Sequence, residues 1–329
     1  MHPSLRLLPA VSLVALCALP ALAQYTPSAG QNAPSTAYES HRDEKTGAIT
    51  LRKDDATKVV QRDDHGNARG NQYDLAVDGA FEGQTVLILD QTGNTLVNTR
   101  AALKEKGLSS VVYASGLTPS PAELKKALSK SCELWLISAG APLLTDEHLA
   151  LIKAFFDAGH GVYIWGDNDP YYVDANRLAS ALVPGLRMEG DLAGNQTVGI
   201  ADGKSAKVGL RAGHLITTGL EHLYEGVTIA TVQFTSGHGR NAALYDGEGG
   251  ASRSPSLPEG FTVLLSGSAG NLVTVAYEKD GKRLLMDGGF TRLAVSWDDA
   301  GTARYVKNAA AWLVHAERFS DTVATRTAK

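Results

Sequence analysis

The stretch GQTVLILDQTG, residues 83–93, decides how this chain folds. Its apolar run from Val86 to Leu89 is uninterrupted, as in a strand that is buried on both faces of a parallel sheet. The run ends in Asp-Gln-Thr-Gly, where the chain leaves the strand. The stretch therefore predicts the first strand of a helix-covered α/β sheet.

Strand-like and helix-like segments alternate after this first strand. Strands are expected at SSVVYA (109–114), ELWLIS (133–138) and GVYIWG (161–166), and helices over about 94–106, from Ser120 onward, over 146–158 and over 172–182. The start of the second helix is marked by Ser120 as N-cap, Pro121 at the first helical position and Glu123 at the third, which form a capping box. Four strand–helix units in succession predict an α/β domain with a parallel sheet flanked by helices.

After Pro184 the sequence pattern changes to shorter strand-like runs separated by Gly-rich loops. Lys279-Asp280-Gly281-Lys282 is a hairpin signal, because Asp-Gly is a favoured two-residue turn. An amphipathic helix over about 300–319 closes the pattern. We therefore expect one α/β domain over 81–319, with additional β strands and a hairpin in its C-terminal half and a flexible tail at 320–329.

The first 23 residues have the pattern of a removed secretory signal peptide. An apolar run from Leu7 to Leu19 precedes Ala21-Leu22-Ala23, so cleavage is expected after Ala23. This predicts a periplasmic or secreted protein. Residues 24–80 are polar and rich in Gly, Pro and charge, which predicts a mostly disordered leader with one short strand at AITLR, residues 48–52.

Composition excludes several kinds of partner. The formal net charge is −4 and no Lys/Arg block resembles a nucleic-acid footprint, so no nucleic-acid partner is expected. No later window offers about 20 uninterrupted apolar residues, so no transmembrane segment is expected after signal removal. Signal removal leaves Cys132 as the only thiol, which excludes an intramolecular disulfide.

Three motifs, in this order, resemble the class I glutamine amidotransferase-like superfamily over about residues 83–317. They are ALIKAFFDAGHGVYIWGDND (150–169), GHLITTGL (213–220) and KRLLMDGGFTRL (282–293). They are similar to the helix and strand that enter the family's nucleophile elbow, to a His-Pro-Ile-Thr-x-Gly-Leu segment of several branches, and to the last core strand. The resemblance implies a flavodoxin-like sheet.

The chain departs from that family where the family's chemistry resides. Catalytic members place Cys at the elbow and a His with a nearby Glu after the last strand, whereas this chain has Asp167 at the elbow and Asp287-Gly288-Gly289-Phe290 after the last strand. Cys132 begins a different strand, about 20 Å from its carboxyl end at ~3.3 Å per residue. The resemblance therefore implies a secreted, non-amidotransferase branch that lacks the catalytic Cys.

Fold geometry selects the candidate binding residues, because ligands of open parallel sheets bind at the carboxyl ends of the strands. The side chains expected there are Asp90, Gln91, Thr92, Ser138, Gly140, Gly166, Asp167, Asn168, Asp169, Tyr171 and Asp287.

Two of these groups have competing interpretations. Gly166 with Asp167 or Asp169 could form only a tight corner that caps the next helix, or Asp167 and Asn168 could line a polar pocket walled by Tyr171 and Tyr172. Asp90 and Thr92 match the start of a von Willebrand factor A metal site, with Asn94 in the third place and IADG (200–203) as a later acidic ligand, which would suit Mg²⁺ or Ca²⁺.

The leading hypothesis is a secreted or periplasmic, non-catalytic module that binds a small ligand or a protein partner at the strand ends, with no cofactor. One alternative is a hydrolase, for example one directed at carbohydrate or cell-wall material, that uses Asp167 with His214 or His238. The other is a divalent-metal-dependent adhesion module at Asp90 and Thr92.

Overall fold

The computed structural model describes residues 38–42, 49–53, 60–94, 96–200, 208–234 and 257–319. Its main sheet has eight strands in the order β4-β3-β5-β6-β14-β13-β12-β9. Their bounds are Ser109–Tyr113 (β4), Thr85–Asp90 (β3), Glu133–Ile137 (β5), Gly161–Trp165 (β6), Lys282–Asp287 (β14), Leu272–Lys279 (β13), Phe261–Ser266 (β12) and Gly209–Leu210 (β9).

The first five strands in this order are parallel, and the last three are antiparallel to their neighbours. The five parallel strands follow the flavodoxin-like order, with the first strand in the chain (β3) between the second and third. The predicted α/β class is therefore confirmed, and the sheet is parallel in its first part only.

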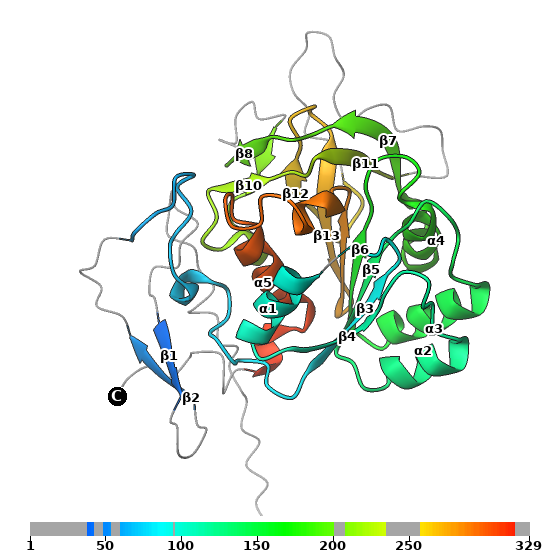
Figure 1. Ribbon diagram of the computed structural model, residues 1–329, viewed down its shortest axis with the longest axis horizontal. Helices are drawn as coiled ribbons and strands as arrows, with labels where there is room; N and C mark the ends of the chain where they lie inside the picture. The colour runs from blue at the N-terminus through cyan, green and yellow to red at the C-terminus, as the bar shows by residue number, and fades with distance from the viewer. Residues whose placement is uncertain are drawn as a thin grey trace, which may run out of the picture.

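Helices cover both faces of the sheet, and each face has its own apolar core (Figure 1). On one face lie α1 (Val97–Glu105) and α5 (Thr302–Leu313). On the other lie α2 (Pro121–Leu128), α3 (Asp146–Asp157) and α4 (Val173–Leu182). The predicted capping box is present: Ser120 Oγ accepts from Glu123 N, and the Glu123 carboxylate accepts from Ser120 N. Local sequence therefore places the second helix correctly to the residue.

The C-terminal half adds the predicted extra strands. β7 (Leu186–Ala193) pairs with β11 (Thr228–Phe234), and β8 (Thr197–Gly199) pairs with β10 (His222–Tyr224). The β13–β14 hairpin turns at Asp280 and Gly281, whose φ angles of 53° and 71° are those of a type I′ turn. The expected last helix is shorter than predicted: α5 ends at Leu313, His315 has a φ of 60°, and a 3₁₀ turn, η4 (Ala316–Phe319), follows.

Several of the predicted segments lie outside the described residues. The predicted signal peptide and the tail at 320–329 lie outside the described residues, as does His238. Within the described ranges, no helix has both the length and the apolar character needed to cross a membrane. The short strand predicted at 48–52 is present as β2 (Ile49–Lys53), paired with β1 (Tyr38–Arg42).

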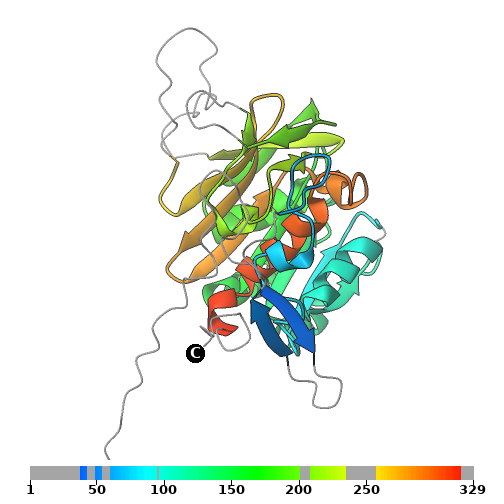
Figure 2. The same ribbon diagram turned by 90° about the vertical axis from the view of Figure 1, so that its left-hand side faces the viewer.

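The prediction of a mostly disordered leader is wrong for residues 60–80. Leu75, Ala76 and Ala80 are buried in the same core cluster as α5, and Tyr73 of the 3₁₀ turn η1 (Asn71–Tyr73) is buried beside Ala68. In Figure 2 this blue-cyan segment lies beside the orange-red α5. The segment has few apolar residues at regular spacing, so the sequence pattern does not show this; buried ion pairs fix it in place together with those apolar contacts.

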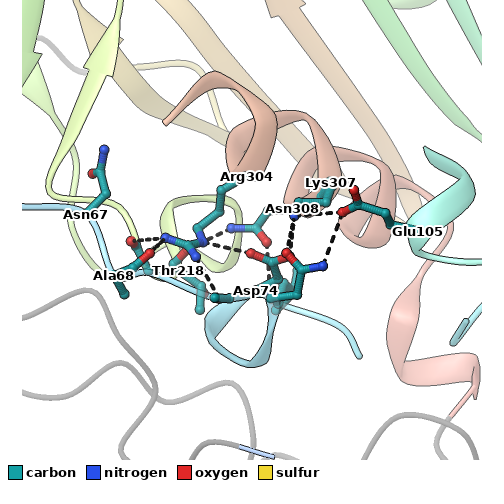
Figure 3. Close-up of polar contacts among 12 residues, drawn as sticks. Asn67, Ala68, Asp74, Glu105, Thr218, Arg304, Lys307 and Asn308 are labelled. Carbon is teal, nitrogen blue, oxygen red and sulfur yellow. Dashed lines mark hydrogen bonds and ion pairs between the residues drawn. The ribbon is translucent and has the colours of Figure 1, made fainter. Parts of the chain in front are cut away.

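Asp74 is the centre of that charge cluster (Figure 3). Its carboxylate, which is fully buried, lies 2.8 Å from Lys106 Nζ, 2.7 Å from Arg304 Nε and 2.8 Å from Lys307 Nζ. Asp78 pairs with Lys106, and Glu105 pairs with Lys307, so three carboxylates balance three cations. Burial by itself would raise the pKa of Asp74, but the three cations together hold it well below its usual range.

Two α5 side chains extend this cluster into the backbone. The Arg304 guanidinium donates to the carbonyl oxygens of Ala68, Gly70 and Gly219. Asn308 Oδ1 accepts from Leu75 N at 2.7 Å, while its Nδ2 donates to Ile216 O and Thr218 O. The segment before the sheet and the segment around η2 (Leu215–Thr217) are therefore both held by one helix.

Replacing Asp74 by Asn should lower the free energy of unfolding by about 3–5 kcal/mol, because it leaves three buried cations short of a carboxylate. Asp157→Asn is the matched control: Asp157 also pairs with two lysines, Lys153 and Lys282, but at the surface, where the loss should be below about 1 kcal/mol. Urea unfolding measures both. Equal losses in the two variants would contradict the central role of Asp74.

Glu133→Gln should stabilise the protein at neutral pH. Glu133 is fully buried, neither carboxyl oxygen makes a hydrogen bond of good geometry in the described structure, and burial raises its pKa well above the usual value, offset only in part by the Trp135 indole. A carboxyl with a raised folded-state pKa favours folding below its unfolded pKa of about 4.3 and loses that contribution as the pH rises through the folded value. The melting temperature of Glu133→Gln should exceed that of the wild type at pH 8 by at least ~2 °C and converge with it at pH 4. A wild type that melts higher at pH 8 would refute this account.

Candidate functional site

The carboxyl ends of β3 and β5 form the switch point of the parallel sheet. The chain leaves β3 toward α1 on one face and leaves β5 toward α3 on the other (Figure 1). Loops that diverge in this way leave a crevice at the strand ends, where ligands of doubly wound sheets bind. A shallow hollow that is partly open to solvent lies at the β3 side of this point.

Three segments line the hollow. Asp90 and Gln91 at the end of β3 form its floor, the 113–119 loop after β4 forms one wall, and Leu143 and Leu144 before α3 form the other. Two of the predicted binding residues therefore lie in the hollow. Its wall residues at 113–119 and 143–144 were not predicted, because the sequence gives no sign of which loops face each other.

Asp90 shapes the turn that follows β3. Its Oδ1 accepts hydrogen bonds from Thr92 N at 3.0 Å, Thr92 Oγ1 at 2.7 Å and Gly93 N at 3.2 Å. The residue is 2% exposed, and its Oδ2 makes no hydrogen bond within the described part of the chain. One carboxyl oxygen thus holds the loop while the second stays free in a residue that lines the hollow.

Gln91 is fixed at both ends of its amide. Its Nε2 donates to Asp174 Oδ2 at 2.8 Å, and its Oε1 accepts from Ala139 N at 3.1 Å. Asp174 Oδ2 also accepts from Leu143 N and Leu144 N, so one buried carboxylate fixes both the floor and a wall of the hollow. Sequence reasoning missed Asp174; its only signal is that it is an acidic residue in the first turn of α4.

Ser138 and the predicted glycines have packing roles. Ser138 Oγ accepts from Ala175 N at 3.1 Å and so joins the end of β5 to α4. A Cβ on Gly140 would lie 2.7 Å from Pro170 Cγ, and a Cβ on Gly166 would lie 2.5 Å from the Met188 sulfur. These positions require glycine because other side chains approach closely, not because a ligand does.

Asp167 forms a corner and does not face an open pocket. It is fully buried, its Oδ1 accepts from Asn168 N at 2.8 Å, and its Oδ2 accepts from Thr291 N at 3.3 Å. Burial raises its pKa, and hydrogen bonds from threonine side chains and backbone N–H groups offset part of this effect. The predicted cap of α4 is wrong, because Tyr172 is the N-cap and makes no side-chain capping bond. Of this stretch, Asn168, Asp169 and Tyr171 reach the solvent.

Asp287 is part of the core. Its Oδ2 accepts from Thr274 Oγ1 at 2.9 Å and Tyr305 OH at 3.1 Å, and its Oδ1 lies 3.0 Å from Arg292 Nη2. Both Asp287 and Arg292 are fully buried, so the last strand ends in a closed polar network. Asp287 is thus not available to a ligand.

The described geometry separates the residues of the hydrolase alternative. His214 packs against Trp312 near the end of α5, and the carbonyl of Trp312 accepts from Arg283 at the amino end of β14. Asp167 follows the carboxyl end of the neighbouring parallel strand β6, so pairing of Asp167 with His214 is excluded. His214 instead caps η2, where its Nδ1 accepts from Ile216 N.

Cys132 also lies at the amino edge. It precedes β5, and both its N and Sγ donate to the carbonyl of Thr85, the first residue of β3. Burial raises the pKa of the thiol, and the neighbouring Glu133 raises it further. Both effects oppose formation of the thiolate, so Cys132 does not have the lowered pKa of a nucleophilic cysteine.

The described structure brings together Asp90 and Thr92, two of the residues expected for the metal site. Asp90 and Thr92 meet, but through a hydrogen bond between their own side chains. Across the described ranges, no three acidic, His or Cys side chains converge as metal ligands. Most of the IADG segment lies outside those ranges.

Comparisons with known proteins return distant structural similarities. No family model matches the chain, and no curated protein matches it. A protein assigned as a GMP synthase component from Thermoplasma acidophilum is 12% identical with a TM-score of 0.41, over 73% of this chain and 98% of that one. An exo-β-1,4-mannosidase from Opitutaceae bacterium strain TAV5 (12%, TM-score 0.37) and the carbohydrate deacetylase Agd3 (11%, TM-score 0.40) each match over 71% of this chain, which spans 36% and 32% of their lengths. The α/β class rests on the strand order itself.

The ring of His214 should titrate far below an ordinary histidine. Burial, and then the nearby Arg283, lower its pKa to about 4, so the ring should be neutral at pH 7. Because the unfolded value is about 6.5, His214 should lose its stabilising contribution as the pH falls from 6.5 toward 4. NMR titration of the ring measures this, with the resonance assigned by its absence in His214→Asn, a variant that retains an N-cap. A pKa at or above 6.5 would be incompatible with the buried position.

Proposed function

We propose that this protein is a binding module whose ligand occupies the hollow at the end of β3. The observation that carries the proposal is the pre-formed floor: Gln91 is held at both ends by Asp174 and Ala139, and Asp90 keeps one oxygen free. A site whose polar groups are already fixed loses little conformational entropy when a ligand binds.

Binding suits this hollow better than catalysis. Its lining contains no His, Cys, Lys or Arg, and among the described residues none of the three hydroxyl side chains in the wall, Tyr113, Ser115 and Thr118, is hydrogen-bonded to a base. A nucleophile activated by a positioned base is the usual signature of covalent catalysis. The hollow has the shape and polar floor of a recognition site without that pair.

The size of the hollow restricts the ligand. Its enclosed space is about 10 Å³, far below the ~300–1,000 Å³ that is typical of sites for drug-sized molecules, so a ligand would lie partly in solvent. We therefore propose a small molecule, or a single side chain of a partner, as the ligand. The predicted signal peptide would place this binding event in the periplasm or outside the cell.

A bulky residue in the wall tests the proposal. Ser115 is exposed and lines the hollow, so Ser115→Trp should fill it without disturbing the core. Ser129→Trp, at an exposed serine after α2, is the matched control. Saturation-transfer NMR with a panel of small amines, amino acids, monosaccharides and carboxylates measures binding.

The expected result is that at least one class of probe binds the wild type and Ser129→Trp, and that its signal falls at least tenfold in Ser115→Trp. Probes that bind all three proteins equally would place the site elsewhere and overturn the proposal. A wild type that binds no member of the panel would count equally against it.

A further inference from the structure

We infer that the hollow recognises one positively charged nitrogen, an ammonium at the end of a short hydrocarbon chain, and that Asp90 Oδ2 is its partner. The inference rests on the proposed function of the hollow and adds the chemical class of the ligand. Three features of the described residues support it: the charge of the lining, the use of the loop N–H groups, and the nature of the walls.

The charge of the lining is that of a cation site. Asp90 is the single ionisable carboxylate among the residues around the hollow, and no Lys, Arg or His accompanies it. Asp90 takes part in none of the ion pairs found in the described ranges, although only 2% of its surface is exposed. Asp90 Oδ2 is not among the buried side-chain atoms that lack a partner, so it is open to an approaching group, and an ammonium could form a charge-assisted hydrogen bond with it that a neutral ligand could not.

The turn after β3 is closed to anions. In many doubly wound folds the N–H groups at this position cradle a phosphate. Here the N–H groups of Thr92 and Gly93 already donate to Asp90 Oδ1. A phosphate would meet occupied donors and a carboxylate, so nucleotides and other phosphate esters are excluded.

The walls fit a hydrocarbon chain. Leu89, Tyr113, Pro119, Leu143 and Leu144 supply apolar surface around the polar floor. The Tyr113 ring adds a π face that favours a nearby cation. The shared ligand chemistry is a primary alkylamine, either as a free amine or as the lysine side chain of a peptide.

An isosteric series tests the charge directly. The probes are n-butylamine, n-butanol and n-butyrate, which place a cation, a neutral hydroxyl and an anion on the same chain. Titrations followed by saturation-transfer NMR at pH 7 should show butylammonium binding at least tenfold more tightly than butanol, and no butyrate binding. Butanol or butyrate binding as tightly as the amine would overturn the inference.

Asp90→Asn tests the role of Oδ2 separately from that of Oδ1. The Asn Oδ1 can still accept from Thr92 and Gly93 and keep the turn, while its amide places N–H groups where Oδ2 was. Amine affinity should fall at least tenfold in Asp90→Asn and stay within twofold in Asp169→Asn, which removes the same charge from an exposed position after β6. An equal effect of both variants would mean that only the general field attracts the amine, which contradicts the inference. Unchanged thermal unfolding of Asp90→Asn checks that the turn persists.

Two further experiments distinguish a free amine from a lysine side chain, and a wrong cation assignment from a wrong binding site. Nα-acetyl-lysine methylamide, alone and within an Ala-Lys-Ala peptide, compares a lysine side chain with the free amine, and tighter binding of the peptide identifies a protein partner. Ser115→Trp distinguishes the failures. If it abolishes binding of a neutral probe that Asp90→Asn leaves unchanged, the hollow is the site but the cation assignment is wrong. If it leaves amine binding unchanged, both are wrong.

Discussion

The buried carboxylate of Asp74 is the interaction on which the described domain depends most. Three cations from two helices reach it, Lys106 directly after α1 and Arg304 and Lys307 from α5. Without it, these cations would repel one another within the core, and the polar anchors of the 60–80 segment on α5 would be reduced to hydrogen bonds such as those of Arg304 and Asn308 to its backbone. The helix that covers one face of the sheet is therefore fixed by the segment that precedes the first strand of that sheet.

Buried aspartates also hold the loops at the carboxyl edge of the sheet. Asp167, Asp174 and Asp287 are fully buried, and each is hydrogen-bonded through both of its oxygens. They close the corner after β6, the entry to α4 and the end of β14. Asp90 differs because its Oδ1 alone satisfies the turn. Among these four aspartates, Asp90 alone has a carboxyl oxygen, Oδ2, without a hydrogen-bond partner in the described residues, and Asp90 lines the hollow.

Several of these roles could be predicted from the sequence, and others could not. The strand at 85–90, the capping box at Ser120 and the Asp280-Gly281 turn depend on contacts within a few residues, so local pattern identified them. The strand ends were predicted correctly as an edge, which placed Asp90 and Gln91. Which polar residues on that edge are buried was not visible, because burial depends on loops that meet from distant parts of the chain, as Asp167 and Thr291 do.

By itself, the sequence determined the α/β class, the order of the strand–helix units, and the absence of a Cys from the elbow and of a His directly after the last strand, because these properties lie in short-range periodicity and in residue identity. Only the tertiary structure decided that residues 60–80 belong to the folded domain, that His214 is far from Asp167, and that Asp174 supports Gln91. Those facts arise from ion pairs and hydrogen bonds between residues 30 to more than 200 positions apart, and no local pattern encodes such pairings.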